Sequence, residues 1–97
     1  MIDIQPGHLE IVNKIFSDIL PACEVFVFGS RAEESAKEHS DLDLLIKGNR
    51  VLDNSVMRNL KTAFEESDLP FRVDIVDWAT TQETFRKMIQ KQMIKLL

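Results

Sequence analysis

The sequence predicts an α/β (α+β) fold in which a small mixed β-sheet is flanked by helices. Apolar runs that are too short for helices occur at 25–28, 41–46 and 71–77 and indicate buried strands. The segments before, between and after them repeat apolar residues at helical spacing. A sheet of three or more strands covered by helices is the simplest way to bury both kinds of apolar surface.

The first helix is predicted to end before Pro21, because the residues ahead of it follow the i, i+3, i+4 pattern of an amphipathic helix. Its apolar face comprises Leu9, Val12, Ile15, Phe16, Ile19 and Leu20. Val25–Phe28, rich in β-branched and aromatic residues, then predicts a strand that ends at Gly29. A short helix is expected over 31–39, with Ser30 as its N-cap.

The second half of the chain predicts another helix followed by a third strand. Asp53, Asn54 and Ser55 offer N-caps for a helix that ends before Pro70, because proline disfavours helical conformation in the residue that precedes it. Residues 71–77 then form a strand, and its alternation places Asp74 on the face opposite to its apolar neighbours Val73 and Ile75.

The last helix is expected to start with a capping box formed by Thr80 and Glu83. Its apolar stripe comprises Phe85, Met88, Ile89 and Met93. A basic stripe on the same helix comprises Lys87, Lys91 and Lys95. We interpret it as a solvated face, with contact to a partner's acidic surface or to an RNA as the alternative. The segment 93–97 fits either the end of this helix or a short strand.

Length and composition bound the class of protein. The chain has 97 residues, which we interpret as one domain over 1–97, and a formal net charge of -4. The negative charge argues against binding long nucleic acid through phosphate contacts. We expect a soluble cytoplasmic protein with no membrane contact, because no apolar run approaches the ~18 residues of a membrane span and the lone Cys23 suits a reducing compartment.

The chemistry is concentrated in one glycine turn and three carboxylates. Gly29 and Ser30 form a turn where backbone N–H groups can approach a phosphate. Asp41 and Asp43 point to the same side of their strand, about 7 Å apart, and Asp74 occupies the middle of another strand, where aspartate is disfavoured. Hard oxygen ligands favour Mg²⁺ or Mn²⁺.

Each of these residues also has a purely structural interpretation. Asp74 could lie on an edge strand and face water, paired with Arg72. Arg31 is a candidate phosphate ligand, but an arginine in a loop is more often a surface charge. We interpret Asp77 as a turn residue and His39 as a solvated loop residue.

The segments around these residues resemble the minimal nucleotidyltransferases of the DNA polymerase beta superfamily. The similarity is carried by the sequences at 29–32, 40–46 and 73–76, and it extends over about residues 8–90. The resemblance implies that Gly29 and Ser30 hold a nucleoside triphosphate such as ATP. It also implies that Asp41, Asp43 and Asp74 bind two magnesium ions.

The resemblance further implies a biological role. Such proteins often act as the antitoxin of a toxin–antitoxin pair with a helical HEPN-domain partner, which some of them adenylylate. We therefore expect transfer of AMP from ATP to a hydroxyl group of that partner. The alternatives are an antitoxin that neutralises its partner by binding alone and a regulatory nucleotide-binding module, and self-association stays open.

Overall fold

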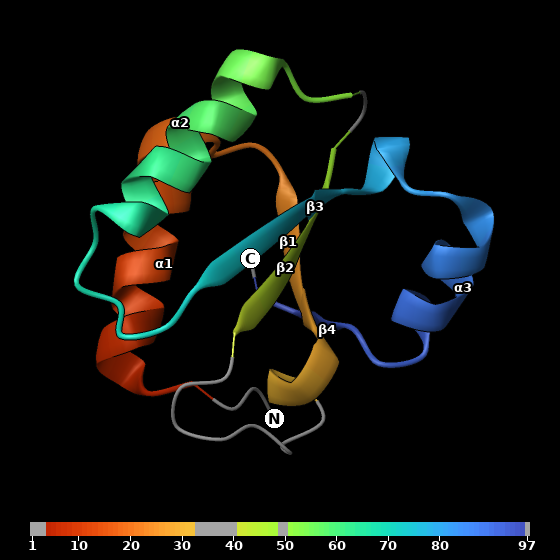
Figure 1. The fold of residues 1–97 in the computed structure, drawn as a ribbon, viewed down its shortest axis with the longest axis horizontal. Coiled ribbons are helices and arrows are strands. Elements are labelled where there is room, and N and C mark those ends of the chain that lie inside the picture. The colour runs from red at the N-terminus through yellow and green to blue at the C-terminus, as the bar shows by residue number, and fades with distance from the viewer. Residues whose placement is uncertain (1–3, 33–40, 49–50, 97) are drawn as a thin grey trace.

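The computed structural model describes residues 4–32, 41–48 and 51–96 and confirms the expected fold class (Figure 1). Three α-helices, two short 3₁₀ turns and four strands follow one another along the described chain. Their order is α1 (Pro6–Ile19), β1 (Glu24–Phe28), η1 (Gly29–Arg31), β2 (Leu42–Lys47), α2 (Asn54–Glu65), β3 (Val73–Asp77), η2 (Trp78–Thr80), α3 (Glu83–Gln90) and β4 (Ile94–Lys95).

The four described strands form one mixed sheet in the order β3-β2-β1-β4. Strand β1 runs antiparallel to both β2 and β4, whereas β2 and β3 are parallel. The register sets Phe28 opposite Asp43 and sets Asp43 opposite Asp74. The fold therefore brings the end of β1 and the beginnings of β2 and β3 to the same end of the sheet.

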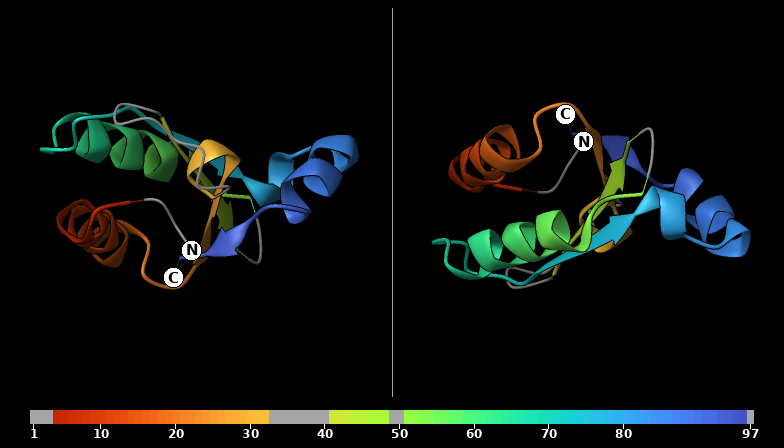
Figure 2. Two further views of the ribbon diagram at one scale, coloured as in Figure 1. Left: turned by 90° about the horizontal axis from the view of Figure 1, so that it is seen from below. Right: turned by 90° about the horizontal axis from the view of Figure 1, so that it is seen from above.

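The two faces of the sheet are covered by different helices. Alternate residues of a strand point to opposite faces, so Leu42, Leu44 and Ile46 share one face and are fully buried in the larger hydrophobic core, with Val12 and Phe16 of α1. The opposite face carries Leu45 and packs against α3. Figure 2 shows α1 and α2 on one side of the sheet and α3 on the other.

The beginning of α3 differs from the expectation. No capping box forms, because α3 begins at Glu83 and the Thr80 hydroxyl instead donates to the Asp77 carbonyl, 3.2 Å away. Ile89 is buried as predicted, but Phe85 is 39% exposed and Met88 is 61% exposed. The predicted apolar stripe is therefore wrong in part: this helix is short and only Ile89 is buried against the sheet.

The chain after α3 returns to the sheet, so the predicted basic stripe is also wrong. Lys95 lies in β4, not on the helix, and its Nζ pairs with Glu24 of the neighbouring β1 at 3.5 Å. Lys87 pairs with Glu83 within α3 at 3.7 Å. The short-strand alternative for this segment is thus the one observed.

Asp77, which the sequence indicated as a turn residue, is the buried last residue of β3 and the N-cap of η2. Its Oδ2 accepts a hydrogen bond from the Leu52 N–H at 2.9 Å, and its Oδ1 accepts one from the Ala79 N–H at 3.0 Å. Hydrogen bonds to a charged group contribute about 1.5–3 kcal/mol each. Asp77 therefore fixes the end of β3 to the segment that precedes α2.

Some expectations fall on residues that lie outside the described ranges. The helix predicted over 31–39 is described only at its start, where Gly29–Arg31 form the 3₁₀ turn η1, and His39 is not among the described residues. None of the described helices is long and apolar enough to cross a membrane.

Candidate active site

Gly29 begins the turn at the end of β1, and its conformation is required there. Its φ of 75° lies in the left-handed region that residues with a Cβ rarely adopt. A Cβ built on Gly29 would collide with the Asp43 Oδ2 and lie 3.4 Å from the Asp43 Cγ. The backbone of the turn therefore packs directly against one of the predicted catalytic carboxylates, as the register of Phe28 with Asp43 requires.

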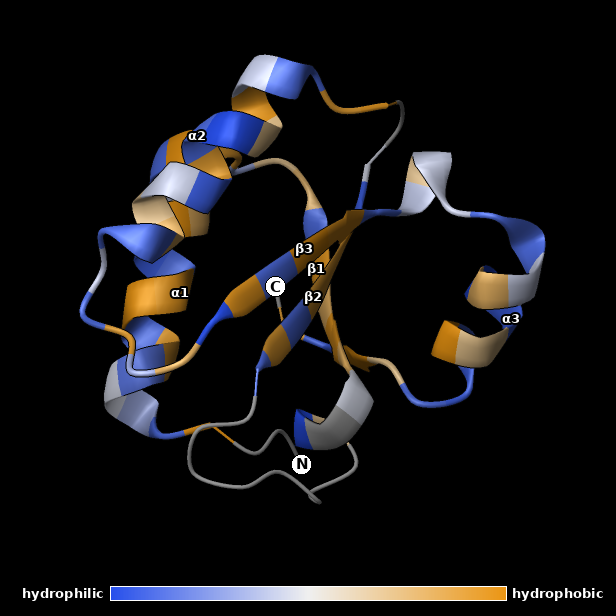
Figure 3. Ribbon diagram, in the orientation of Figure 1, coloured by the Kyte–Doolittle hydropathy of each residue, from blue (hydrophilic) through white to orange (hydrophobic). Residues whose placement is uncertain are grey.

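Asp43 and Asp74 are cross-strand neighbours. Their strands are parallel and in register at this pair, so both side chains project from the same face of the sheet, and neighbouring strands lie about 4.8 Å apart. Asp41 immediately precedes β2 and, two residues from Asp43, lies on the same side of the chain. Figure 3 shows hydrophilic segments interrupting β2 and β3 at adjacent positions.

The electrostatics of Asp43 show that the three carboxylates act on one another. Partial burial raises the pKa of Asp43, and the negative charges of Asp74 and Asp41 raise it further. A carboxylate with two like-charged neighbours is costly to ionise unless a cation offsets the repulsion. This cluster therefore has the charge and the hard oxygen donors that a divalent cation requires.

The carboxylates are close, but they are not drawn together in a formed metal site. Within the described ranges, no three acidic, histidine or cysteine side chains are grouped closely enough to hold a metal ion. Asp74 has another partner, because its Oδ1 lies 3.4 Å from the Arg72 Nε. The edge-strand pairing considered for Asp74 is thus present, and it coexists with the placement of Asp74 beside Asp43.

Arg31 is not a surface charge. Its side chain is only 6% exposed, and its guanidinium carbon lies 4.1 Å from the centre of the Phe71 ring. The edge of the same ring meets His8 of α1, with the ring centres 5.5 Å apart. Arg31 therefore anchors the glycine turn to the segment that leads into β3 through a cation–π contact.

The roles of Phe71 and His8 are not visible in the sequence. A cation–π contact joins residues that are distant along the chain and leaves no spacing pattern. Ser30, the other predicted nucleotide ligand, is the residue of η1 that follows Gly29. Of the predicted site residues, the structure brings Gly29, Asp43 and Asp74 to one end of the sheet, with Asp41 beside them and Arg31 behind the turn.

A groove lies beside this site, along the outer edge of β3. It has a volume of about 570 Å³, and its lining includes Arg72 and Asp74 together with Phe64 and Glu65 of α2. Asp74, the cross-strand neighbour of Asp43, therefore also borders the groove at the edge of the sheet.

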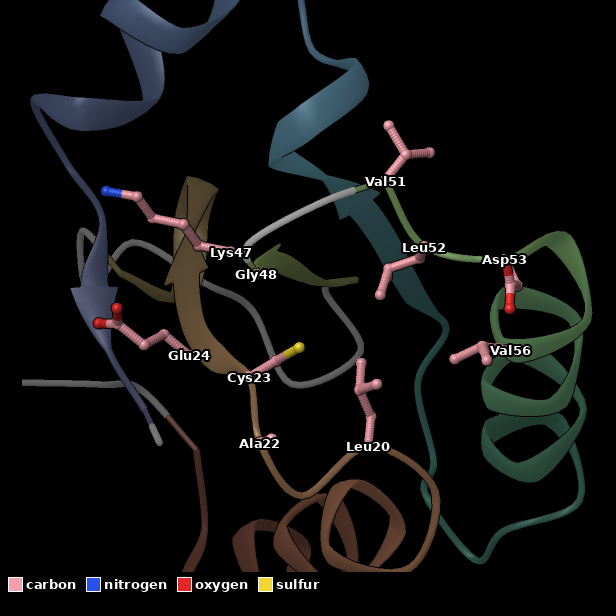
Figure 4. A pocket seen from close by; sticks show the side chains of 10 residues that line it. All are labelled: Leu20, Ala22, Cys23, Glu24, Lys47, Gly48, Val51, Leu52, Asp53 and Val56. Carbon is pink, nitrogen blue, oxygen red and sulfur yellow. The ribbon is translucent and has the colours of Figure 1, made fainter.

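A separate cavity of about 510 Å³ lies at the other end of the sheet (Figure 4). Leu20, Leu52 and Val56 form much of its wall, and the Cys23 thiol points among them. Burial raises the pKa of this thiol, and the negative charge of Asp77 raises it further, so the thiol stays protonated. None of the predicted site residues lines this cavity.

The fold is the one expected of a nucleotidyltransferase, and comparison with known families agrees. The model of the family described as polymerase beta, nucleotidyltransferase matches residues 10–97. The chain belongs to this family of DNA polymerase beta-like nucleotidyltransferases.

One protein and two solved structures are similar to this chain over most of its length. The chain is 49% identical over 90 residues to the probable protein adenylyltransferase MntA of Haemophilus influenzae, covering 93% of this chain and 79% of that protein. A crystal structure of a toxin–antitoxin with AMP-PNP superposes with a TM-score of 0.76 at 23% identity, over 92% of this chain and 72% of that one. A structure from Shewanella oneidensis, of a tri-AMPylated HEPN toxin in complex with MNT antitoxin, superposes with a TM-score of 0.73 at 21% identity. The match covers 97% of this chain and 72% of that one.

We predict that Gly29→Ala destabilises the protein and impairs the site. The left-handed conformation costs a residue with a Cβ about 1–2 kcal/mol, and the new methyl group would displace the Asp43 carboxylate. Thermal unfolding should show a melting temperature lower by several degrees. Gly7→Ala is the matched control, because nothing lies within 4 Å of a Cβ at that position. Equal melting temperatures for the two variants would contradict this account of Gly29.

We also predict that Asp43→Asn stabilises the metal-free protein at neutral pH. Because the pKa of Asp43 is raised in the folded state, the wild type loses stability as the pH rises through that folded pKa, whereas asparagine carries no charge to repel its neighbours. The gain in melting temperature should shrink as the pH falls below the ordinary aspartate pKa of about 3.9. The exposed Asp68 provides a control substitution, Asp68→Asn. A lower melting temperature for Asp43→Asn at pH 7 in the presence of chelator would refute the repulsion.

Proposed function

We propose that this protein is a magnesium-dependent protein adenylyltransferase that transfers AMP from ATP to a hydroxyl group of a HEPN-domain toxin and thereby acts as its antitoxin. The observation that carries the proposal is the register that sets Asp43 beside Asp74, with the Gly29 turn packed on Asp43. The 49% identity to a probable protein adenylyltransferase supports the same activity. The cytoplasm, where ATP and a reduced Cys23 coexist, is the location that this activity requires.

The donor set decides which metal suits the site. Asp41, Asp43 and Asp74 would hold two Mg²⁺ ions, or Mn²⁺ in their place, because carboxylate oxygens are the ligands that these cations prefer. Bound there, the cations supply charge neutralisation for the triphosphate and its leaving pyrophosphate. The raised pKa of Asp43 fits this role, since an opposite charge would relieve the repulsion that raises it.

The residues of this chain then divide the work of the transfer. The turn at Gly29 and Ser30 binds the triphosphate through its backbone N–H groups. Arg31 holds this turn in place by stacking on Phe71. Asp74 orients the acceptor hydroxyl and accepts its proton. The acceptor oxygen forms a bond to the α-phosphorus, the bond from that phosphorus to the bridging oxygen breaks, and pyrophosphate leaves.

A second function, neutralisation of the partner by binding alone, is favoured by a different observation. Phe85 and Met88, three residues apart on α3, leave apolar surface exposed that a bound partner would bury. This function requires neither nucleotide nor metal. The double variant Asp41→Asn/Asp43→Asn, described next, separates the two functions.

We predict that Asp41→Asn/Asp43→Asn lowers the rate of transfer at least about 100-fold, because removing these charges removes the electrostatic stabilisation of the reacting phosphate. The assay follows the label from ATP labelled at its α-phosphate into a HEPN-domain toxin in the presence of Mg²⁺. The control is Asp18→Asn/Asp68→Asn, which makes the same charge change at two exposed aspartates away from the site.

Transfer that persists in the Asp41→Asn/Asp43→Asn variant would exclude this site. Loss of transfer with toxin neutralisation intact would favour the binding-only function. Loss of both activities, with the control variant unaffected, supports antitoxin action through adenylylation.

A further inference from the structure

The outer edge of β3 is a groove over its whole length. The sheet order places β3 at one edge, and no other described strand pairs with it on that side. The groove that contains Asp74 adjoins a second cavity of about 400 Å³, and the two share Lys61, Ile75 and Val76 in their linings. Together they run from Phe71 to Asp77, about 20 Å at the rise of an extended chain.

The lining shows that the groove follows the strand edge and not one face of the sheet. Val73 and Ile75 point toward the helices α1 and α2, whereas Asp74 and Val76 point to the opposite face, yet all four border the same space. The opposite wall is α2, which lies alongside β3 (Figure 2).

The backbone of β3 offers hydrogen-bonding groups to this groove. The Leu42 N–H donates to the Arg72 carbonyl at 2.9 Å, so Arg72 and, by alternation, Asp74 and Val76 direct their backbone groups toward β2. Val73 and Ile75 consequently direct theirs to the outer edge. An edge of this kind is a template for pairing with another extended chain.

We propose that this groove binds the acceptor as an extended polypeptide segment that adds to β3 as a further strand and presents its hydroxyl-bearing side chain to Asp74. The proposal rests on the proposed function and names the form in which the substrate enters. The occupant is a segment of the protein to be adenylylated, carrying a serine, threonine or tyrosine.

The register that pairs Asp43 with Asp74 explains why a strand fits the chemistry. Side chains of directly opposed residues in neighbouring strands project from the same face with Cβ atoms about 5 Å apart. A residue opposite Asp74 in an added strand would therefore project onto the face that carries Asp43 and Asp74. Its hydroxyl would then lie beside the carboxylate that accepts the proton.

An extended peptide also matches the groove better than a nucleic acid does. The walls carry the apolar side chains Phe64, Leu69 and Ile75, and charges of both signs at Lys61 and Glu65. A strand supplies main-chain hydrogen bonds along the edge and alternating side chains for the walls. The two cations of the lining, Lys61 and Arg72, are matched by the two carboxylates Glu65 and Asp74, so the groove lacks the excess of positive charge that a phosphate backbone requires.

The experiment obstructs the groove without touching the site residues. Lys61 is exposed on α2 at the junction of the two cavities, and Lys61→Trp places a large ring there. Arg58→Trp is the matched control, because it also replaces a cation by tryptophan at an exposed position of α2, and that position lines neither cavity. We expect Lys61→Trp to raise the KM for a HEPN-domain acceptor at least tenfold and Arg58→Trp to leave it unchanged.

A second readout is independent of catalysis. Amide hydrogen exchange followed by NMR should slow at Val73 and Ile75 when the acceptor protein is added, because their N–H groups become hydrogen-bonded to the added strand. The melting-temperature rise that Mg²⁺ with ATP produces should be the same in wild type and Lys61→Trp, which shows that the nucleotide site is intact.

The outcomes separate this proposal from the proposed function. Two results would overturn the groove as the acceptor site and leave the proposed enzymatic activity unaffected. One is transfer by the wild type without slower amide exchange at Val73 and Ile75, and the other is an equal change of KM in the two tryptophan variants. If exchange slows at both amides in the wild type but not in Lys61→Trp, and no transfer occurs, the groove is supported as a polypeptide site. The same result overturns the adenylyltransferase activity. Neither slowing nor transfer overturns both.

Discussion

The parallel pairing of β2 with β3 is the constraint on which the rest of the site depends. It sets two aspartates side by side, and the negative charge of Asp74 helps to raise the pKa of Asp43. The core is arranged to hold this pairing, because Leu42, Leu44 and Ile46 are fully buried between the carboxylates and the helices α1 and α2. The repulsion between the two aspartates is thus opposed by the packing of the best-buried residues of the fold.

The Gly29 turn and the end of β3 complete the frame around this pair. The antiparallel partner β1 delivers Gly29 onto Asp43, and Arg31 ties the turn to Phe71, only three residues before Asp74. At the other end of β3, Asp77 accepts two backbone hydrogen bonds from the segments on either side. The strands that bear site residues are therefore held by these contacts in addition to the hydrogen bonds of the sheet.

Much of this could be predicted from the sequence, because it depends on local patterns. Strand alternation correctly separated Asp74 from Val73 and Ile75, and the apolar periodicity located α1 and α2. The glycine followed by two alternating aspartates indicated the site, since each residue type has a distinct physical reason to be there. The order of the strands, which brings β2 next to β3, could be inferred only through the resemblance to a known family.

The remainder depends on contacts that leave no local pattern. Arg31 stacks on Phe71, and Phe71 in turn meets His8; both residues are far from Arg31 along the chain. The capping box at Thr80 failed because Asp77 offers the hydroxyl a nearby carbonyl, and Met88 is exposed because α3 buries little more than Ile89. The groove along β3 exists only because that strand is at the edge of the sheet, which requires the full topology.

The central proposal is that Asp41, Asp43 and Asp74 together bind the divalent cations at the Gly29 end of the sheet. Paramagnetic Mn²⁺ added with a non-hydrolysable ATP analogue tests it most directly, because the ion broadens NMR signals of nearby amides. The account predicts that broadening begins at the amides of Gly29, Asp43 and Asp74 and is weakest at the far end of the sheet, around Cys23. Broadening centred on any other part of the chain, or none at these three residues, would contradict it.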